Sequence, residues 1–348
     1  MYYFVRFRGG CQDAQYDFQE DLLIEDVISV KYGILHFPNA VVFENYMLGL
    51  EEYPVVGRDS FESLFSLVNR NQGTNLRIKE EVKNSISEFM DTPLLKMLDK
   101  DGLIAIGGYF IALDFERELA AVTKESNKVN LIRNKEYDDI SIQLYSFEDE
   151  LLQILFGNEG ISKYLTYINE VSDGRNLRIQ ECPGTPRPGL SLLFRPTTSL
   201  PNPTSNRQTE WSFDSPPING RQYRIRAKHA YQAAAVYFRL KSELEHYARN
   251  FDQSSIFSPE RDPFASITYW GDFTPNNLSR RFLDGCWTEC QGCWPQPANT
   301  NKVQKVHWEA GRRLTQVNLH MIFRGRIGGS DAGINAIQFE FRLIPIAR

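Results

Sequence analysis

A cluster of prolines divides this chain and constrains its fold more than any other feature. Eight of the 17 prolines fall between Cys182 and Pro217, at positions 183, 186, 188, 196, 201, 203, 216 and 217. Proline lacks the backbone N–H donor and fixes φ, so this density excludes regular helix and central strands. A length of 348 residues is also long for one hydrophobic core. We therefore predict two domains, residues 1–174 and 221–348, joined by a proline-rich connecting segment, residues 175–220.

The charges divide at the same place. Residues 1–174 hold 30 acidic and 16 basic side chains, and residues 175–348 hold 14 and 23, within a net charge of −5. In the second half 19 of the basic residues are arginines, whose planar fork suits carboxylate, phosphate and aromatic partners. The first interpretation is that the two halves attract each other or a neighbouring copy. The alternative is a binding face for an anionic polymer.

Hydrophobic periodicity predicts a mixture of short strands and helices in the acidic half. Apolar residues at helical spacing indicate helices at 61–68, 78–90 and 148–156. Short apolar runs bounded by Asp101-Gly102 and Gly107-Gly108 indicate an antiparallel meander. The predicted strands span residues 30–37, 103–106, 109–115, 119–123 and 140–145.

The basic half favours β-structure. In residues 221–229, Tyr223, Ile225 and Ala227 alternate with charged residues, as in a strand with one solvated face. Residues 318–327 and 337–343 alternate in the same way, whereas 230–247 fits a long strand or a helix equally well. The predicted fold class is α+β, with a mixed helix and short-strand N-terminal domain followed by a mostly antiparallel, β-sandwich-like C-terminal domain.

Three cysteines in residues 286–294, CWTECQGCW, allow three kinds of site. The C-x3-C-x2-C spacing resembles the iron–sulfur loop of radical S-adenosylmethionine enzymes, but only 55 residues follow Cys293, too few for the rest of that barrel. A zinc site would need Cys182 or His307 as a fourth ligand. The preferred interpretation is a set of disulfides in an oxidising compartment. The candidate disulfide cysteines are Cys182, Cys286, Cys290 and Cys293.

The fifth cysteine is a candidate lipid anchor. Small residues precede Cys11 and a polar, acidic segment follows it, as at the junction where a bacterial lipoprotein is cleaved and acylated. Residues 1–8 lack the apolar stretch of a secretory signal peptide. We therefore expect contact with a membrane only through this anchor.

No catalytic or cofactor motif accompanies these features. The five histidines form no H-E-x-x-H pair, and no G-x-S-x-G, Walker loop or Rossmann fingerprint is present. We expect no cofactor and no nucleic-acid partner. One candidate surface for an anionic ligand or an interface would form if its strands were neighbours. Its members are Arg221, Arg224, Arg226, Lys228, Arg312, Arg313, Arg324 and Arg326.

Three stretches resemble uncharacterised secreted or lipid-anchored envelope proteins of Bacteroidota-type bacteria. They are GILHF at 33–37, KDGLIAIGGYFIALDF at 100–115 and YRIRAKHAYQAAAVYF at 223–238. The resemblance implies an envelope location and carries no reaction. We interpret the chain as an extracellular or outer-surface, non-enzymatic protein that binds or assembles, with other protein chains, copies of itself or glycan as partners. The alternatives are a secreted hydrolase acting on polysaccharide or peptide, and a phage structural protein.

Overall fold

The computed structural model combines helices and largely antiparallel sheets, which places the chain in the α+β class. It describes residues 27–50, 52–71, 86–157, 207–215, 217, 219–251, 255–260, 266–278, 280–287, 301–327 and 335–342.

The N-terminal domain is a seven-stranded mixed sheet in the order β3-β1-β2-β4-β5-β6-β7. The β1–β3 and β2–β4 pairs are parallel and the other pairs are antiparallel. Its strands are β1 (Ile28–Lys31), β2 (Ile34–Phe37), β3 (Val55–Val56), β4 (Leu103–Ile106), β5 (Tyr109–Asp114), β6 (Leu119–Thr123) and β7 (Gln143–Ser146). Its helices are α1 (Ala40–Leu48), α2 (Leu64–Asn71), α4 (Leu94–Met97), α5 (Val129–Arg133) and α6 (Leu151–Phe156), with short 3-10 turns at Arg58–Ser60 and Ser126–Lys128.

Local signals explain most of these boundaries. Helix α1 starts at Asn39, whose side chain accepts a hydrogen bond from the Val42 amide (2.9 Å), and ends at Gly49 in the left-handed conformation. The β4–β5–β6 meander confirms the strands predicted at 103–106, 109–115 and 119–123 to within one residue. The strand predicted at 30–37 is instead a hairpin, because Tyr32 and Gly33 both take positive φ and reverse the chain.

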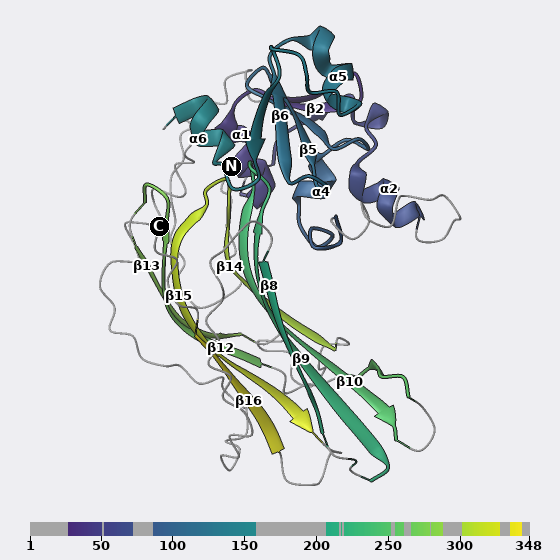
Figure 1. Cartoon of the computed structure of the whole chain (residues 1–348), viewed down its shortest axis with the longest axis vertical. Coiled ribbons are helices and arrows are strands. Elements are labelled where there is room, and N and C mark those ends of the chain that lie inside the picture. Colours follow the sequence, from purple (N-terminus) through teal and green to yellow (C-terminus); the bar gives the residue numbers. More distant parts are fainter. Residues whose placement is uncertain are drawn as a thin grey trace, which may run out of the picture.

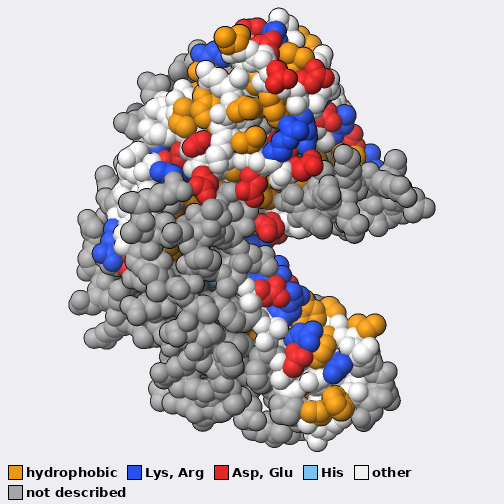
Figure 2. Space-filling view, viewed as in Figure 1, with side chains coloured by type: hydrophobic (Ala, Val, Ile, Leu, Met, Phe, Trp, Pro, Cys, Tyr) orange, Lys and Arg blue, Asp and Glu red, His pale blue; other side chains and the backbone are white. Residues whose placement is uncertain are grey.

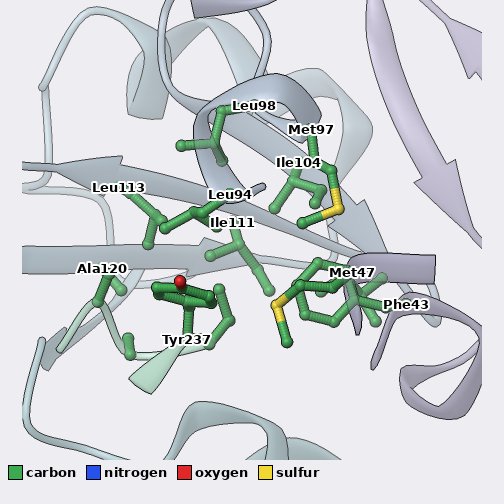
Figure 3. Close-up of a cluster of buried hydrophobic side chains, with 14 of the residues drawn as sticks. Phe43, Met47, Leu94, Met97, Leu98, Ile104, Ile111, Leu113, Ala120 and Tyr237 are labelled. Carbon is green, nitrogen blue, oxygen red and sulfur yellow. The ribbon is translucent and has the colours of Figure 1, made fainter. Parts of the chain in front are cut away.

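The sheet buries an apolar layer on each face. One face packs Ile34, Ala105, Phe110 and Ala121 against α5. The other face forms a larger core with α1, α4 and α6, in which Phe43, Leu94, Ile104 and Ile111 are fully buried. Figure 3 shows this larger core closing around Tyr237, a residue that comes from the C-terminal half.

The C-terminal half consists of two sheets (Figure 1). In the first, β10 pairs with β9, β11 and β14, and β8 pairs with β9; in the second, the order is β13-β12-β15-β16. The bounds are β8 (Arg207–Asp214), β9 (Arg221–Ala233), β10 (Phe238–Asn250), β11 (Ser258–Pro259), β12 (Ser266–Pro275), β13 (Arg281–Trp287), β14 (Lys302–Ala310), β15 (Leu314–Ile327) and β16 (Asn335–Arg342).

The β9–β10 hairpin joins the two halves. Its turn, Ala234 to Tyr237, is fully buried in the larger N-terminal core. The Ala235 amide donates to the Phe147 carbonyl (2.9 Å), and the Leu151 amide donates to the Ala235 carbonyl (3.0 Å). Residues 230–247 are thus neither one strand nor a helix, because the chain reverses at Ala235, whose φ is +55°.

A second turn is clamped at the same junction. The Gly311 amide donates to Glu44 Oε1 (3.1 Å), and the Arg313 amide donates to Glu150 Oε1 (3.0 Å). Both carboxylates belong to the N-terminal domain and both are buried. The β14–β15 turn is therefore held by two N-terminal glutamates, so the junction has apolar and polar components.

The predicted connecting segment needs one correction. Strand β8 occupies the end of residues 175–220 and pairs along its whole length with β9. Its eight residues contain no proline, so the proline argument does not apply to them. Residues 175–206 lie outside the described part of the chain. No helix within the described residues is long and apolar enough to cross a membrane.

Candidate functional site

A charged groove of about 490 Å³ lies where the N-terminal domain meets the β8–β9–β10–β14 sheet. The segment from Ser87 to Asp91 forms the N-terminal wall, and strand side chains form the floor. Figure 2 shows the molecule hollowed between the N-terminal domain and the lower strands, with acidic and basic side chains mixed along the edge. The lining residues are Ser87, Glu88, Met90, Asp91, Glu210, Arg226, Lys228, Ala230, Gln232, Lys241, Glu243, Glu245 and Lys302.

Strand register sets the order of charges on the floor. Alternate residues of a strand face the same side, and residues directly opposite on neighbouring strands lie in contact range. Lys228 on β9 is opposite Glu210 on β8 and Glu243 on β10. Arg226 is likewise opposite Glu245. The pairings therefore place a carboxylate on both sides of Lys228 and on the β10 side of Arg226.

Glu243 is the most buried carboxylate of the groove, with an exposed fraction of 3%. Its oxygens lie 2.5 Å from Lys302 Nζ, 3.7 Å from Lys241 Nζ and 3.8 Å from Lys228 Nζ. A buried carboxylate is costly unless it is paired, and three ammonium groups supply that compensation.

Two carboxylates on the N-terminal wall have opposite environments. Burial alone would raise the pKa of Asp91, but Arg239 (3.1 Å) and Lys241 (2.8 Å) lower that pKa to about 2. Burial, and then the nearby Glu118, raise the pKa of Glu88. Glu88 forms no ion pair with any described residue, although its backbone carbonyl accepts a hydrogen bond from Gln232. It is the carboxylate of the groove whose charge is least compensated.

Two carboxylates of the groove are held by cations. A general base or nucleophile needs a carboxylate with free lone pairs and a suitable pKa, whereas Asp91 and Glu243 are each occupied by several cations. Within the described residues, no group of three or more His, Cys, Asp and Glu side chains is placed to hold a metal ion. The groove can offer a charged ligand alternating positive and negative partners.

The β9 part of the predicted cationic surface is paired within the chain. Arg224 makes a bidentate contact with Asp214 (2.6 and 2.7 Å), and Arg226 contacts Glu210 (2.5 Å). Arg221 contacts Glu260 at 3.0 Å. Sequence analysis identified the basic residues but not the carboxylates that face them, because those come from other strands.

The rest of that predicted surface is dispersed. Arg312 was expected on the surface, which is wrong: it is 1% exposed and lies in the junction near Glu44 and Glu150. Arg313 is partly buried beside it. Arg324 and Arg326 lie on β15, which pairs with β12 and β16 and not with β9; their side chains lie outside the described part. The predicted surface is therefore not one continuous sheet face, because β9 and β15 belong to different sheets.

The cysteine predictions remain open. Cys286 lies in β13, opposite Thr268 of β12. Cys11, Cys182, Cys290 and Cys293 lie outside the described residues, so the disulfides and the lipid anchor stay predictions.

A buried polar cluster forms a second feature that sequence analysis missed. Ser242 Oγ on β10 lies 3.0 Å from His229 Nδ1 on β9 and 2.8 Å from His307 Nε2 on β14. The other ring nitrogens, His229 Nε2 and His307 Nδ1, have no hydrogen-bond partner among the residues that the structure describes. Burial lowers the pKa of His229 to about 3 and, together with His229 and Lys305, places the pKa of His307 well below its usual value. Both rings are neutral at physiological pH, and no carboxylate of the described residues hydrogen-bonds to either ring.

Comparison with known proteins gives no relative: no family model, no curated protein and no solved structure matches this chain.

Proposed function

We propose that this chain is a non-enzymatic binding or assembly protein of the cell surface, with a β-sandwich-like C-terminal domain, and that the junction groove is its binding site. The observation that carries this proposal is the charge pairing of the groove. Alternating cations and carboxylates recognise a charged ligand, and two carboxylates of the groove, Asp91 and Glu243, already contact several cations.

The chemistry of the groove favours a polypeptide over a glycan. Sugar-binding sites usually supply an aromatic ring for stacking, and the residues that line this groove include none. A segment of another protein chain, or of another copy of this chain, carries the alternating charges that the groove complements. The earlier expectation of partners thus narrows to a charged polypeptide.

Location follows from the sequence features. Disulfides among Cys182, Cys286, Cys290 and Cys293 would require an oxidising compartment, and acylation of Cys11 would tether the chain to the envelope. Both features would support an extracellular or outer-surface location, and fractionation of cells that express this protein would test it.

The direct test is binding of charged peptides to the full chain. Fluorescent peptides with alternating Lys and Glu should bind, and binding should weaken with salt because surface charges are screened. Glu88→Gln should weaken it severalfold, whereas Glu125→Gln, which changes an exposed carboxylate beside the short 3-10 turn Ser126–Lys128, should not. Equal affinity of both variants, or no peptide binding at all, would reject the groove as the site.

A secreted hydrolase is the second candidate, favoured by one observation. Glu88 has a raised pKa and Asp91 a lowered pKa within the same groove, the pattern of an acid and an ionised carboxylate in glycoside hydrolases. Release of reducing sugar from a polysaccharide panel, abolished in Glu88→Gln, would support the hydrolase over the binding protein.

A further inference from the structure

We propose that the outer edge of β7 is a docking site for an extended, positively charged segment of a partner protein, which pairs with β7 as an added strand. This site is separate from the junction groove and does not depend on the function proposed for that groove. It lies within residues 86–157, which the structure describes without a gap.

The backbone of β7 offers hydrogen-bonding groups on its outer side. Strand β7 is the last strand of the N-terminal sheet, and no described strand pairs with its outer edge. The Phe147 amide donates to the Glu118 carbonyl (3.0 Å), so these two residues form a hydrogen-bonded pair. Backbone groups alternate in direction along a strand. Leu144, which is opposite Ala121 and three residues before Phe147, therefore directs its N–H and C=O away from β6.

The turns at both ends of β7 use the other outward backbone groups. Before the strand, the Ile142 amide donates to the Asp139 carbonyl (2.9 Å). After it, the Ser146 amide donates to Asp149 Oδ2 (2.8 Å), and the Ser146 carbonyl accepts from the Asp149 amide (3.0 Å). Among the described residues, Leu144 is thus the residue of β7 that offers a partner strand both a donor and an acceptor.

Apolar side chains are exposed in β7 and just before it. Ile140 is fully exposed and Leu144 is 47% exposed. Ile140 occupies an ordered turn, in which Asp139 Oδ1 accepts from the Ser141 amide (3.0 Å) and hydroxyl (2.7 Å). Lys128 contacts the other oxygen of Asp139. An apolar side chain on a turn that is already ordered is suited to anchor a partner, because little backbone freedom is lost on binding.

Strand β7 also lacks the features that usually prevent pairing at an exposed edge. Natural proteins protect such edges with charged side chains, proline or a β-bulge. Residues Gln143–Ser146, QLYS, include no charge and no proline, and their pairing with β6 has no register shift. Addition of a strand to an open sheet edge is a common mode of peptide recognition.

The charge around β7 favours a cationic partner. Residues 114–150, which include β6, β7 and the turns that flank them, hold 10 acidic and five basic side chains. Two of the basic residues, Lys128 and Lys135, are already paired with carboxylates. A strand that carries Lys or Arg beside its apolar residues complements this negative charge. The acidic residues closest to β7 in sequence are Glu136, Asp138 and Asp139 before it and Glu148, Asp149 and Glu150 after it.

The same charges disfavour a second copy of this chain at the edge. Antiparallel pairing of two β7 strands would place the residues before one strand beside the residues after the other. Both of these segments are acidic, so the two copies would repel each other. The edge therefore fits a cationic strand from a different protein better than it fits itself.

Peptide binding to the full chain tests this proposal. A fluorescent peptide of alternating Lys and Val should bind, and a matched peptide of alternating Glu and Val should bind at least about tenfold more weakly, because of the negative charge around β7. Binding should weaken as salt rises. In hydrogen exchange, the Leu144 amide should exchange quickly in the free protein and become protected by the Lys/Val peptide, to which it then donates.

Two variants remove the proposed contacts. Leu144→Pro removes the outward N–H and places the proline ring in the path of a partner strand. Because this N–H makes no bond to β6, the fold should tolerate the change, which circular dichroism checks. Peptide affinity should fall about tenfold. Ile140→Ser leaves the backbone unchanged and should lower the affinity about threefold.

The matched control is Val56→Ser, which changes an exposed apolar side chain on β3, the opposite edge strand of the same sheet. It should leave peptide affinity unchanged. Absence of Lys/Val binding by the wild type, equal binding by Leu144→Pro, or an equal loss in Val56→Ser would overturn the proposal. So would a loss in Glu88→Gln with none in Leu144→Pro, because the peptide would then occupy the junction groove. Self-association of the wild type that Leu144→Pro abolishes would also overturn it, because a second copy would then cover the edge.

Discussion

The fully buried polar groups of the two halves differ in how they are paired. In the N-terminal domain, Asp99 accepts from the Leu103 and Asp101 amides and contacts Arg133. In the C-terminal half, His229 and His307 contact Ser242 inside the sheet, and their other ring nitrogens have no hydrogen-bond partner among the described residues. Each unmade buried hydrogen bond costs on the order of 1–3 kcal/mol.

The junction supplies the C-terminal half with apolar burial. Among the described side chains, the C-terminal half has an apolar cluster around Leu240, Phe273 and Trp308, and the turn of its β9–β10 hairpin is buried in the N-terminal core. The C-terminal sheets therefore depend on the N-terminal domain for part of their apolar burial. We infer that the two halves are stable as one unit.

Truncation at the junction should have the largest effect. Tyr237→Ala removes a fully buried aromatic ring from the shared core, and such changes cost about 3–5 kcal/mol. Chemical denaturation should show both halves destabilised together. Ile140→Ala, at a fully exposed site, should change stability by less than about 0.5 kcal/mol; a similar loss in both variants would contradict the shared core.

Acid should destabilise the protein through the buried histidines. His229 and His307 are neutral when folded but bind a proton below about pH 6.5 when unfolded, so stability is lost as pH falls below that value. At pH 5.5 the loss is about 1.4 kcal/mol per histidine. Urea midpoints at pH 7.5 and 5.5 measure it. Asp91, with its pKa near 2, contributes a separate loss only below about pH 4. Equal midpoints at pH 7.5 and 5.5 would remove the contrast between the interiors.

A methyl group at Gly311 should disturb the clamped turn. A Cβ there would lie 2.4 Å from Leu152 Cδ1 and 3.4 Å from the Val236 carbonyl oxygen. Overpacking of this kind costs about 1–3 kcal/mol. In a double-mutant cycle, Leu152→Ala should relieve part of the cost of Gly311→Ala. Strict additivity of the two changes would show that they do not meet.

The smallest loss of stability is expected on the face of strands β8 and β9 where charged side chains form ion pairs. Glu210→Gln removes a carboxylate that Arg226 and Lys228 contact at an exposed position. Pairs of this kind contribute about 0–1 kcal/mol. Thermal melts in low and high salt should show a small loss that salt abolishes; a loss as large as that of Tyr237→Ala would mean that the face, and not the core, holds the halves together.

Sequence patterns predicted the β4–β5–β6 meander because short apolar runs and glycine turns agree there. The chain reversal at Ala234–Tyr237 was missed because its sequence, AAVY, contains no residue typical of turns. These residues are apolar because they pack into the core of the N-terminal domain. The groove was missed because its wall and floor are over 100 residues apart. Lys241, Glu243 and Glu245 do alternate along the sequence, and recognising the hairpin would have placed Glu243 opposite Lys228 and Glu245 opposite Arg226.

One unfolding experiment tests the shared core most directly. All five tryptophans lie beyond residue 206, so their fluorescence reports the C-terminal half. The described helices all belong to the N-terminal domain, so helical circular dichroism reports that domain. We predict that both signals change at one guanidinium concentration, with the same midpoint and slope. Two separated transitions would contradict the account, because each half would then be stable without the other.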